Sequence, residues 1–284
     1  MVVVEWATNR AVDVSFHGHQ SPDGSRLLTR DRVVTVSGEV VGSVAGGKSG
    51  WAWADDSRHL CAVYVDSPAP PTDAGGRVPT ELFETLPGSN PAAIAEAGFQ
   101  SNQTGSSALG CSFGHGSATV GESCVIGLCE TWTVDLLSHR VLSHLDLRTA
   151  APRPLLGSLS LDGTLLAVSD ANASAATIYR TADGIAVTSL TGSLVVAFTA
   201  DDKAVLVTHA AGPAQLLDLR GGVIATLPGN QVQSTVVEPG GSRIAVALGD
   251  PGATANGFPG PADLVLVGSF GQLVALAQGV LPQF

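Results

Sequence analysis

The sequence predicts an all-β protein, a β-propeller of six or seven four-stranded antiparallel blades. A nine-residue sequence motif that contains a turn, at 160–168, recurs at 199–207 and at 238–246, at intervals of 39 residues. Short apolar runs of alternating character flank each copy, which is typical of strands. The 34 Gly and 16 Pro are spread along the chain as turn residues. A repeat of about 40 residues built from strands and turns indicates a propeller blade.

The repeat divides the chain into blade units within one domain, 1–284. The units are expected at about 12–47, 48–96, 97–149, 150–192, 193–229 and 230–277. The end segments 1–11 and 278–284 read as additional strands. We expect them to help close the ring, because closure removes the exposed edges of a sheet.

Each unit contains the same four elements in order. An apolar run such as 194–198 precedes the Asp/Gly turn, where Asp bonds its own backbone and Gly accepts positive φ. A second apolar run follows, and then a pair of strands joined by a short turn, as at 178–187. The third unit lacks a clear Asp/Gly turn, and we expect an insert at 102–123 in its place. Residues 91–96 are the one helix-like stretch, and they are too short to matter.

These turn and strand motifs resemble those of the WD40 and WD40-like (TolB-type) propeller family. Ser21-Pro22-Asp23-Gly24 is similar to the family's turn between its first two strands. Only Trp132 approaches the family's Trp-Asp signature, and the Gly-His dipeptide is missing from its usual place. The resemblance covers about 12–284 and implies the fold rather than an activity.

Composition excludes several classes of partner. The formal net charge is −11, with 14 Lys and Arg against 25 Asp and Glu, which disfavours nucleic acid and anionic membrane surfaces. No apolar stretch is long enough for a transmembrane helix. The first residues lack the features of a signal peptide, so the chain as given would be cytoplasmic, or secreted if its N-terminus is truncated. The scarcity of Lys, with Lys48 and Lys203 alone, suggests a GC-rich bacterial source.

The four cysteines do not form a recognisable ligand pattern. Cys111, Cys124 and Cys129 cluster, while Cys61 stands apart. Their spacings are not the paired spacing that zinc prefers. We expect buried free thiols, with a disulfide and a metal site as the alternatives left open.

One segment matches a nucleotide-binding motif. Residues 42–49, Gly-Ser-Val-Ala-Gly-Gly-Lys-Ser, fit G-x-x-x-x-G-K-[ST]. That motif needs a helix opening at Lys48, whereas Trp51-Ala52-Trp53 reads as a strand. A P-loop nucleotide binder is therefore a remote alternative, and the propeller reading makes the segment a loop between blades.

No catalytic, cofactor or metal residues are predicted. Gly114-His115-Gly116-Ser117 is not a nucleophile elbow. The turn carboxylates at Asp23, Asp56, Asp162 and Asp201 read as structural. We therefore expect a non-enzymatic protein. The alternative is a propeller hydrolase or lyase, or the propeller part of a larger hydrolase.

The candidate partner-binding residues come from two features. Trp51 and Trp53 share one face of an innermost strand, where packing between blades competes with an anchoring role. The connections at 66–80 and 249–262 are the longest ones between second and third strands, and elaborated loops often carry function. We expect a protein or peptide partner on that face and a monomeric chain. The predicted contacts are Trp51, Trp53, Asp66, Pro70, Pro71, Asp73, Arg77 and Phe258.

Overall fold

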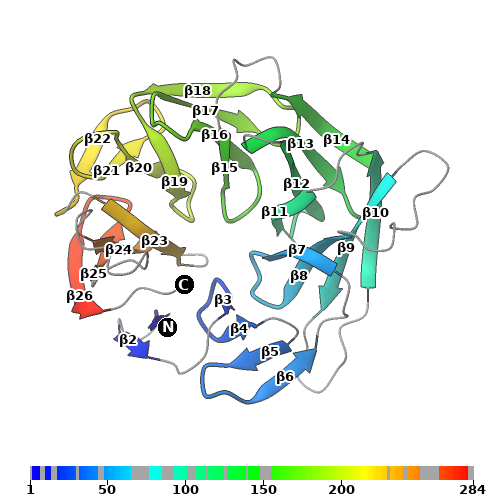
Figure 1. Cartoon of the computed structure of the whole chain (residues 1–284), viewed down its shortest axis with the longest axis horizontal. Coiled ribbons are helices and arrows are strands. Elements are labelled where there is room, and N and C mark those ends of the chain that lie inside the picture. The colour runs from blue at the N-terminus through cyan, green and yellow to red at the C-terminus, as the bar shows by residue number, and fades with distance from the viewer. Residues whose placement is uncertain are drawn as a thin grey trace.

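The computed structural model shows a ring of radially arranged antiparallel sheets, which is a β-propeller (Figure 1). It describes residues 2–6, 10–13, 18–29, 32–43, 48–64, 77–84, 93–100, 106–112, 114–124, 127–138, 140–147, 155–228, 231–238, 242–249 and 262–280. Every regular element within these ranges is a strand. Among the residues so described, no helix is both long and apolar enough to cross a membrane.

The described residues form six four-stranded sheets and one two-stranded sheet. In each four-stranded sheet the strands follow one another in sequence, and the first lies nearest the centre of the ring (Figure 1). The first three blades are β3 (His19–Gln20), β4 (Arg26–Leu28), β5 (Arg32–Thr35) and β6 (Val40–Ser43); β7 (Lys48–Trp53), β8 (His59–Tyr64), β9 (Arg77–Glu84) and β10 (Ala93–Gln100); β11 (Ser106–Ser112), β12 (Ser117–Cys124), β13 (Gly127–Asp135) and β14 (Arg140–Asp146). The last three are β15 (Leu155–Leu159), β16 (Leu165–Asp170), β17 (Ala175–Arg180) and β18 (Ala186–Thr191); β19 (Leu194–Phe198), β20 (Ala204–Thr208), β21 (Gln215–Asp218) and β22 (Val223–Thr226); β23 (Gln231–Val237), β24 (Arg243–Gly249), β25 (Ala262–Gly268) and β26 (Leu273–Val280).

The ring is closed through the N-terminal hairpin. β1 (Val2–Glu5) pairs with β2 (Arg10–Asp13), and β2 contacts β26 of the last blade. The hairpin lies between the last and first four-stranded blades, at the seventh position of the ring (Figure 1). The end strand expected at 1–11 therefore pairs with the residues that follow it. Residues 281–284 lie outside the described part of the chain.

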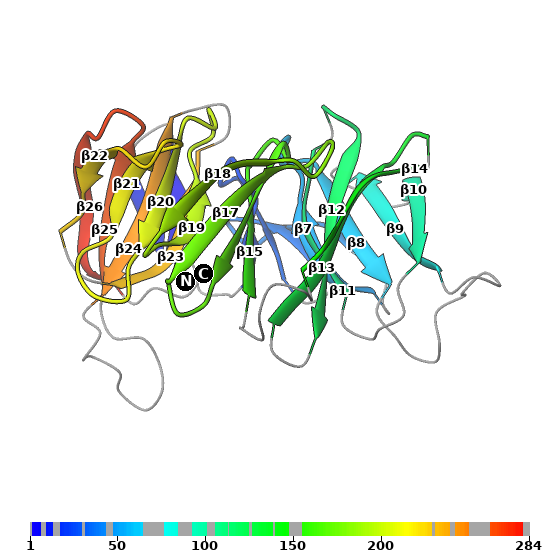
Figure 2. The same ribbon diagram turned by 90° about the horizontal axis from the view of Figure 1, so that it is seen from above.

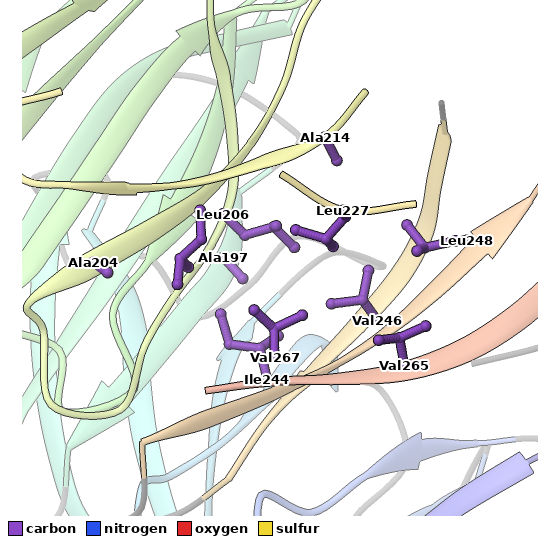
Figure 3. Close-up of a cluster of buried hydrophobic side chains, with 11 residues drawn as sticks. Ala197, Ala204, Leu206, Ala214, Leu227, Ile244, Val246, Leu248, Val265 and Val267 are labelled. Atoms are coloured by element: carbon purple, nitrogen blue, oxygen red, sulfur yellow. The ribbon is translucent and has the colours of Figure 1, made fainter. Parts of the chain in front are cut away.

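The hydrophobic core is a series of layers between neighbouring blades. Alternation along β24 sends Ile244, Val246 and Leu248 toward the fifth blade, and sends Ala245 and Ala247 the other way. Figure 3 shows the layer between the fifth and sixth blades, where β20 and β24 face each other. Because both faces of such a strand are buried, it appears in the sequence as a continuous apolar run.

Two expectations for the second and third blades are wrong. The segment 102–123, expected as an insert, contains β11 and β12, so the third blade is complete. The boundary expected at 96 falls inside β10, which runs from Ala93 to Gln100, pairs with β9 and includes the described part of the helix-like stretch that was expected to be too short to matter. The second blade thus extends past the expected boundary at 96. Cross-strand pairing overrides the weak helical tendency of a short Ala-rich run.

The expectation of free thiols is also wrong for the described cysteines. Cys61 on β8 forms a disulfide with Cys111 on β11, which joins the second blade to the third. Cys129 is also disulfide-bonded. The bonded pair is 50 residues apart in sequence, and the blade interface brings the two side chains together. Spacing rules based on near neighbours cannot detect such a pair.

Candidate functional site

The turns that join the first strand to the second in each blade form a repeated structural unit around the channel. In four of these inner turns, at 21–25, 54–58, 160–164 and 199–203, the third residue is an Asp whose carboxylate accepts the backbone N–H two residues later. The fourth residue has positive φ, at Gly24, Ser57, Gly163 and Asp202. The sequence reading of these aspartates as turn residues agrees with this geometry.

Neighbouring inner turns also bond to one another. The backbone N–H of Asp23 donates to Ser57 Oγ at 2.8 Å, linking the first two blades. Ser112 Oγ donates to Asp55 Oδ2 at 2.8 Å, linking the second and third. Thr164 Oγ1 lies 3.1 Å from Asp202 Oδ2, linking the fourth and fifth. The inner turns are therefore a hydrogen-bonded rim and not independent loops.

Trp6 completes this rim where the ring closes. Its Nε1–H donates to the carbonyl oxygen of Pro22 at 3.1 Å, and its own carbonyl accepts from Arg243 at 3.3 Å. The Arg243 guanidinium also lies 5.7 Å from the centre of the Trp6 ring, within cation–π range. Trp6 thus joins Arg243, at the start of β24 in the sixth blade, to the inner turn of the first blade.

A cavity of about 330 Å³ occupies the central channel, bordered by the innermost strands. Its lining comes from β3, β7, β11, β15 and β23, which are the innermost strands of five blades, from Leu28 of β4, and from the inner turns of the first and fourth blades. Ten of the thirteen lining residues are apolar: Pro22, Leu28, Trp51, Ala52, Trp53, Leu109, Leu159, Leu161, Val236 and Val237. The polar side chains are His19, Gln20 and Thr235, and polar atoms, backbone included, contribute almost as much of the wall as apolar atoms do. A concave site lined by apolar residues and a few polar side chains is typical of a binding site.

Trp51 and Trp53 have two roles in the structure. Both pack against the buried cluster of Leu28, Val33, Val41 and Leu60 between the first two blades, and both line the cavity. Trp53 Nε1 donates to the carbonyl oxygen of His19 at 2.8 Å, which fixes the indole orientation. The pair therefore presents rigid aromatic surface to the channel.

Of the other predicted contacts, the structure describes Arg77 alone, which does not join this pair. Asp66, Pro70, Pro71, Asp73 and Phe258 lie outside the described residues. Arg77 begins β9, the third strand of its blade, whereas the two tryptophans belong to the innermost strand. Second-to-third-strand connections open on the face opposite the inner turns, because successive strands are antiparallel. The cavity lies toward the inner-turn face.

Lys48 has no helical context. It is the first residue of β7 and pairs with Tyr64 of β8. A P-loop requires a helix N-terminus at this lysine, so the match at 42–49 lacks its phosphate-binding geometry. Elsewhere, the residues that the structure describes contain no group of three His, Cys, Asp or Glu placed to hold a metal ion.

Asp162 and Asp202 form an unusual carboxyl pair on the rim. Burial raises the pKa of Asp202 to about 8, and the hydrogen bond and negative charge of Asp162 add to the shift. Burial also acts on Asp162, but hydrogen bonds involving Asp202, Thr164 and Ser160 outweigh it and lower the pKa of Asp162. Sequence reasoning identified the Asp162 turn but did not single out Asp202. Its place in the fourth position, where two other inner turns have Gly, is the signal that could have done so.

Neither a protein-family model nor a curated protein matches the chain. Among solved structures, KlHsv2 with loop 6CD replaced by a Gly-Ser linker is 10% identical over 93% of this chain and 81% of that chain, with a TM-score of 0.48. Hsv2 of Kluyvelomyces marxianus is 12% identical over 85% of this chain and 77% of that chain, with a TM-score of 0.44.

Proposed function

We propose that this chain is a non-enzymatic, WD40-like propeller scaffold that binds a protein or peptide partner. The partner inserts a bulky apolar side chain into the central cavity beside Trp51 and Trp53. The observation that carries the proposal is the cavity itself, which is concave, lined mostly by apolar residues and bordered by two tryptophans.

The energetics of such a contact are favourable. Fully burying a Leu, Phe or Met side chain contributes about 1.5–3 kcal/mol. Interface energy is usually concentrated in a few aromatic or apolar anchors that enter formed pockets. Trp53 is already held by its bond to His19, so little side-chain entropy is lost when a partner packs against it.

The lining also favours binding over catalysis in the channel. His19 is the titratable side chain among the described lining residues. Acid–base chemistry by a side-chain pair would need a second such group within hydrogen-bond reach of the substrate. The perturbed carboxyls, Asp162 and Asp202, belong to the rim and contact each other's turns.

The connections expected at 66–80 and 249–262 stay a second proposed contact region on the opposite face, although residues 77–80 belong to β9 and the end residues 249 and 262 belong to β24 and β25. A partner that used both regions would have to reach both ends of the channel. We therefore assign the apolar anchor to the cavity, and the contribution of the loops is measured separately by deletion.

We infer further that the protein folds in an oxidising compartment. The support is the Cys61–Cys111 disulfide between the second and third blades, since such bonds persist mainly outside the reducing cytosol. Alkylation of the protein in intact source cells, followed by mass measurement, tests this. Cys61 and Cys111 that are modified without prior reduction would contradict it.

Peptide selection tests the binding proposal. Peptides from a random display library are selected on the immobilised protein and then measured against Leu161→Arg, which places a charge at the cavity wall. Leu137→Arg is the matched control, since Leu137 is 88% exposed on the β13–β14 turn. We expect selected peptides to share one bulky apolar residue and to lose at least tenfold in affinity only with Leu161→Arg. Equal binding by both variants would contradict the cavity as the docking site.

A further inference from the structure

Asp202 occupies a left-handed backbone position that is uncommon for non-glycine residues, although Asp adopts it more readily than most and Ser57 adopts it in the second blade. Its φ is 53°, in the left-handed region, where the inner turns of the first and fourth blades have Gly24 and Gly163. A side chain with a Cβ is disfavoured there, and such outliers concentrate at functional positions. The turn could be made more easily with Gly, so the carboxyl group itself needs an explanation.

The contacts of Asp202 cross the boundary between two blades. Its Oδ2 lies 3.1 Å from Thr164 Oγ1 in the inner turn of the fourth blade. The same hydroxyl donates to Asp162 Oδ1 at 2.8 Å. Asp202 Oδ1 is buried, and no donor among the described residues reaches it.

The number of available hydrogens determines the protonation of the pair. Thr164 has one hydroxyl hydrogen and contacts two carboxyl oxygens, so both contacts are hydrogen bonds only if one carboxyl carries a proton. Asp162 Oδ1 also accepts from Ser160 Oγ at 2.8 Å and from the Thr164 backbone N–H at 2.9 Å, which favours its ionised form. Asp202 is then the protonated partner, and it donates through Oδ2 to Thr164 Oγ1. A neutral acid also makes the buried Oδ1 less costly, because an unpaired carbonyl oxygen is easier to bury than a carboxylate.

We propose that a proton on Asp202, donated to the Thr164 hydroxyl beside the ionised Asp162, forms a proton-dependent latch between the inner turns of the fourth and fifth blades. The proton lies on Asp202 when the latch is closed. Loss of this proton leaves two adjacent carboxylates, which repel each other and separate the turns. The latch is a property of the fold and does not depend on the proposed partner.

The charged groups around the pair do not neutralise it. Asp201, in the same turn, adds negative charge, and Lys203 is paired with Asp201 at 3.4 Å. The neighbouring turn of the third blade has Ser112 against Gly163, with Asp55 bonded to Ser112 and His115 exposed nearby in sequence. On the other side, Glu238 is paired with Arg243 at 2.7 Å. The raised pKa of Asp202, about 8, is in keeping with this acidic surrounding and with burial as its main cause.

The sign of the pH effect follows from the position of the proton. The folded chain keeps the proton on Asp202 up to a pH of about 8. The unfolded chain releases it near the ordinary aspartate pKa of about 4. Stability therefore falls as pH rises between about 4 and 8, and the folding equilibrium constant decreases by up to about tenfold per pH unit. Asp162 acts in the opposite direction, but its lowered pKa places its effect below that window. Above a pH of about 8 the folded latch itself ionises.

The test compares Asp202→Asn, Asp202→Gly and the control Asp201→Asn with the wild type, without any partner. Urea unfolding from pH 5 to 9 and the infrared absorption of protonated carboxylic acid at pH 6.5–7 are measured on each protein. We expect the acid band in wild type and Asp201→Asn and its loss in both Asp202 variants. In the wild type the folding equilibrium constant should fall as pH rises over this window. In both Asp202 variants we expect this fall to be absent. Asp202→Gly introduces the residue that the inner turns of the first and fourth blades have at this position, Gly24 and Gly163. It therefore provides the same comparison if Asp202→Asn folds poorly. An acid band that persists in both Asp202 variants, or pH profiles parallel to wild type, would overturn the latch.

Discussion

Replacing Trp6 measures how strongly the ring is closed. Trp6 is 8% exposed and packs on Ala245, Ala247 and other buried residues of the last blade. The alanines of β24 leave room for the indole and are too short to fill the space that Trp6→Ala would create. A buried Trp→Ala change lowers the free energy of unfolding by about 3–5 kcal/mol.

The hydrogen bond of Trp6 adds a separable contribution. Trp6→Phe retains most of the packing but leaves the buried carbonyl of Pro22 without its donor, which costs about 1–3 kcal/mol. The contact with Arg243 contributes about 0.5–2 kcal/mol more, partly retained by Phe. Domains of this kind have a total stability of about 5–15 kcal/mol, so Trp6→Ala removes a large share of it.

Urea unfolding followed by far-ultraviolet circular dichroism measures the loss of unfolding free energy in Trp6→Ala and in Trp6→Phe. The control is Leu137→Ala, an exposed change expected to stay within about 0.5 kcal/mol. The expected order of stability is wild type, then Trp6→Phe, then Trp6→Ala. A loss below about 1 kcal/mol for Trp6→Ala would refute the view that this residue fastens the last blade to the first.

Three further outcomes are expected. Cys61→Ser with Cys111→Ser should lower the free energy of unfolding by about 2–4 kcal/mol, because the bond closes a long loop between two blades, and equal melting temperatures with and without reductant in the wild type would argue against this. Deleting 68–74, which stops before β9, should leave the melting temperature nearly unchanged, and loss of selected-peptide binding would move the docking site to that face. Lys48→Ala should change stability by at most about 0.5 kcal/mol and should not affect Mg·ATP titrations, whereas micromolar ATP binding lost in the variant would restore the P-loop reading.

The sequence predicted the fold where blades share the Asp turn. The 39-residue interval places Asp162 and Asp201 in equivalent turns, and the structure has both. The Asp turn pattern does not identify the third blade. Its strands β11 and β12 are joined by a turn through Gly116, with φ of 61°, that lacks the Asp. A repeat search depends on turn residues, whereas a blade is defined by strand pairing.

The candidate site could be predicted only in part. Alternation along 51–53 indicated two tryptophans on one face, but it could not show that this face also meets the channel. The cavity requires side chains from five blades at once, and the disulfide requires two strands that are distant in sequence. The protonation of Asp202 depends on a hydroxyl in the preceding blade, which no local pattern reports.

Hydrogen exchange on a complex with a selected peptide tests the central proposal most directly. Binding in the cavity should slow exchange of backbone amides at 51–53, 159–161 and 235–237, which belong to three different blades and border the cavity. Residues 223–226 of β22, an outermost strand, should exchange as in the free protein. Slower exchange restricted to 65–76 and 250–261, with the cavity segments unchanged, would show that the partner docks on the opposite face and would contradict the account.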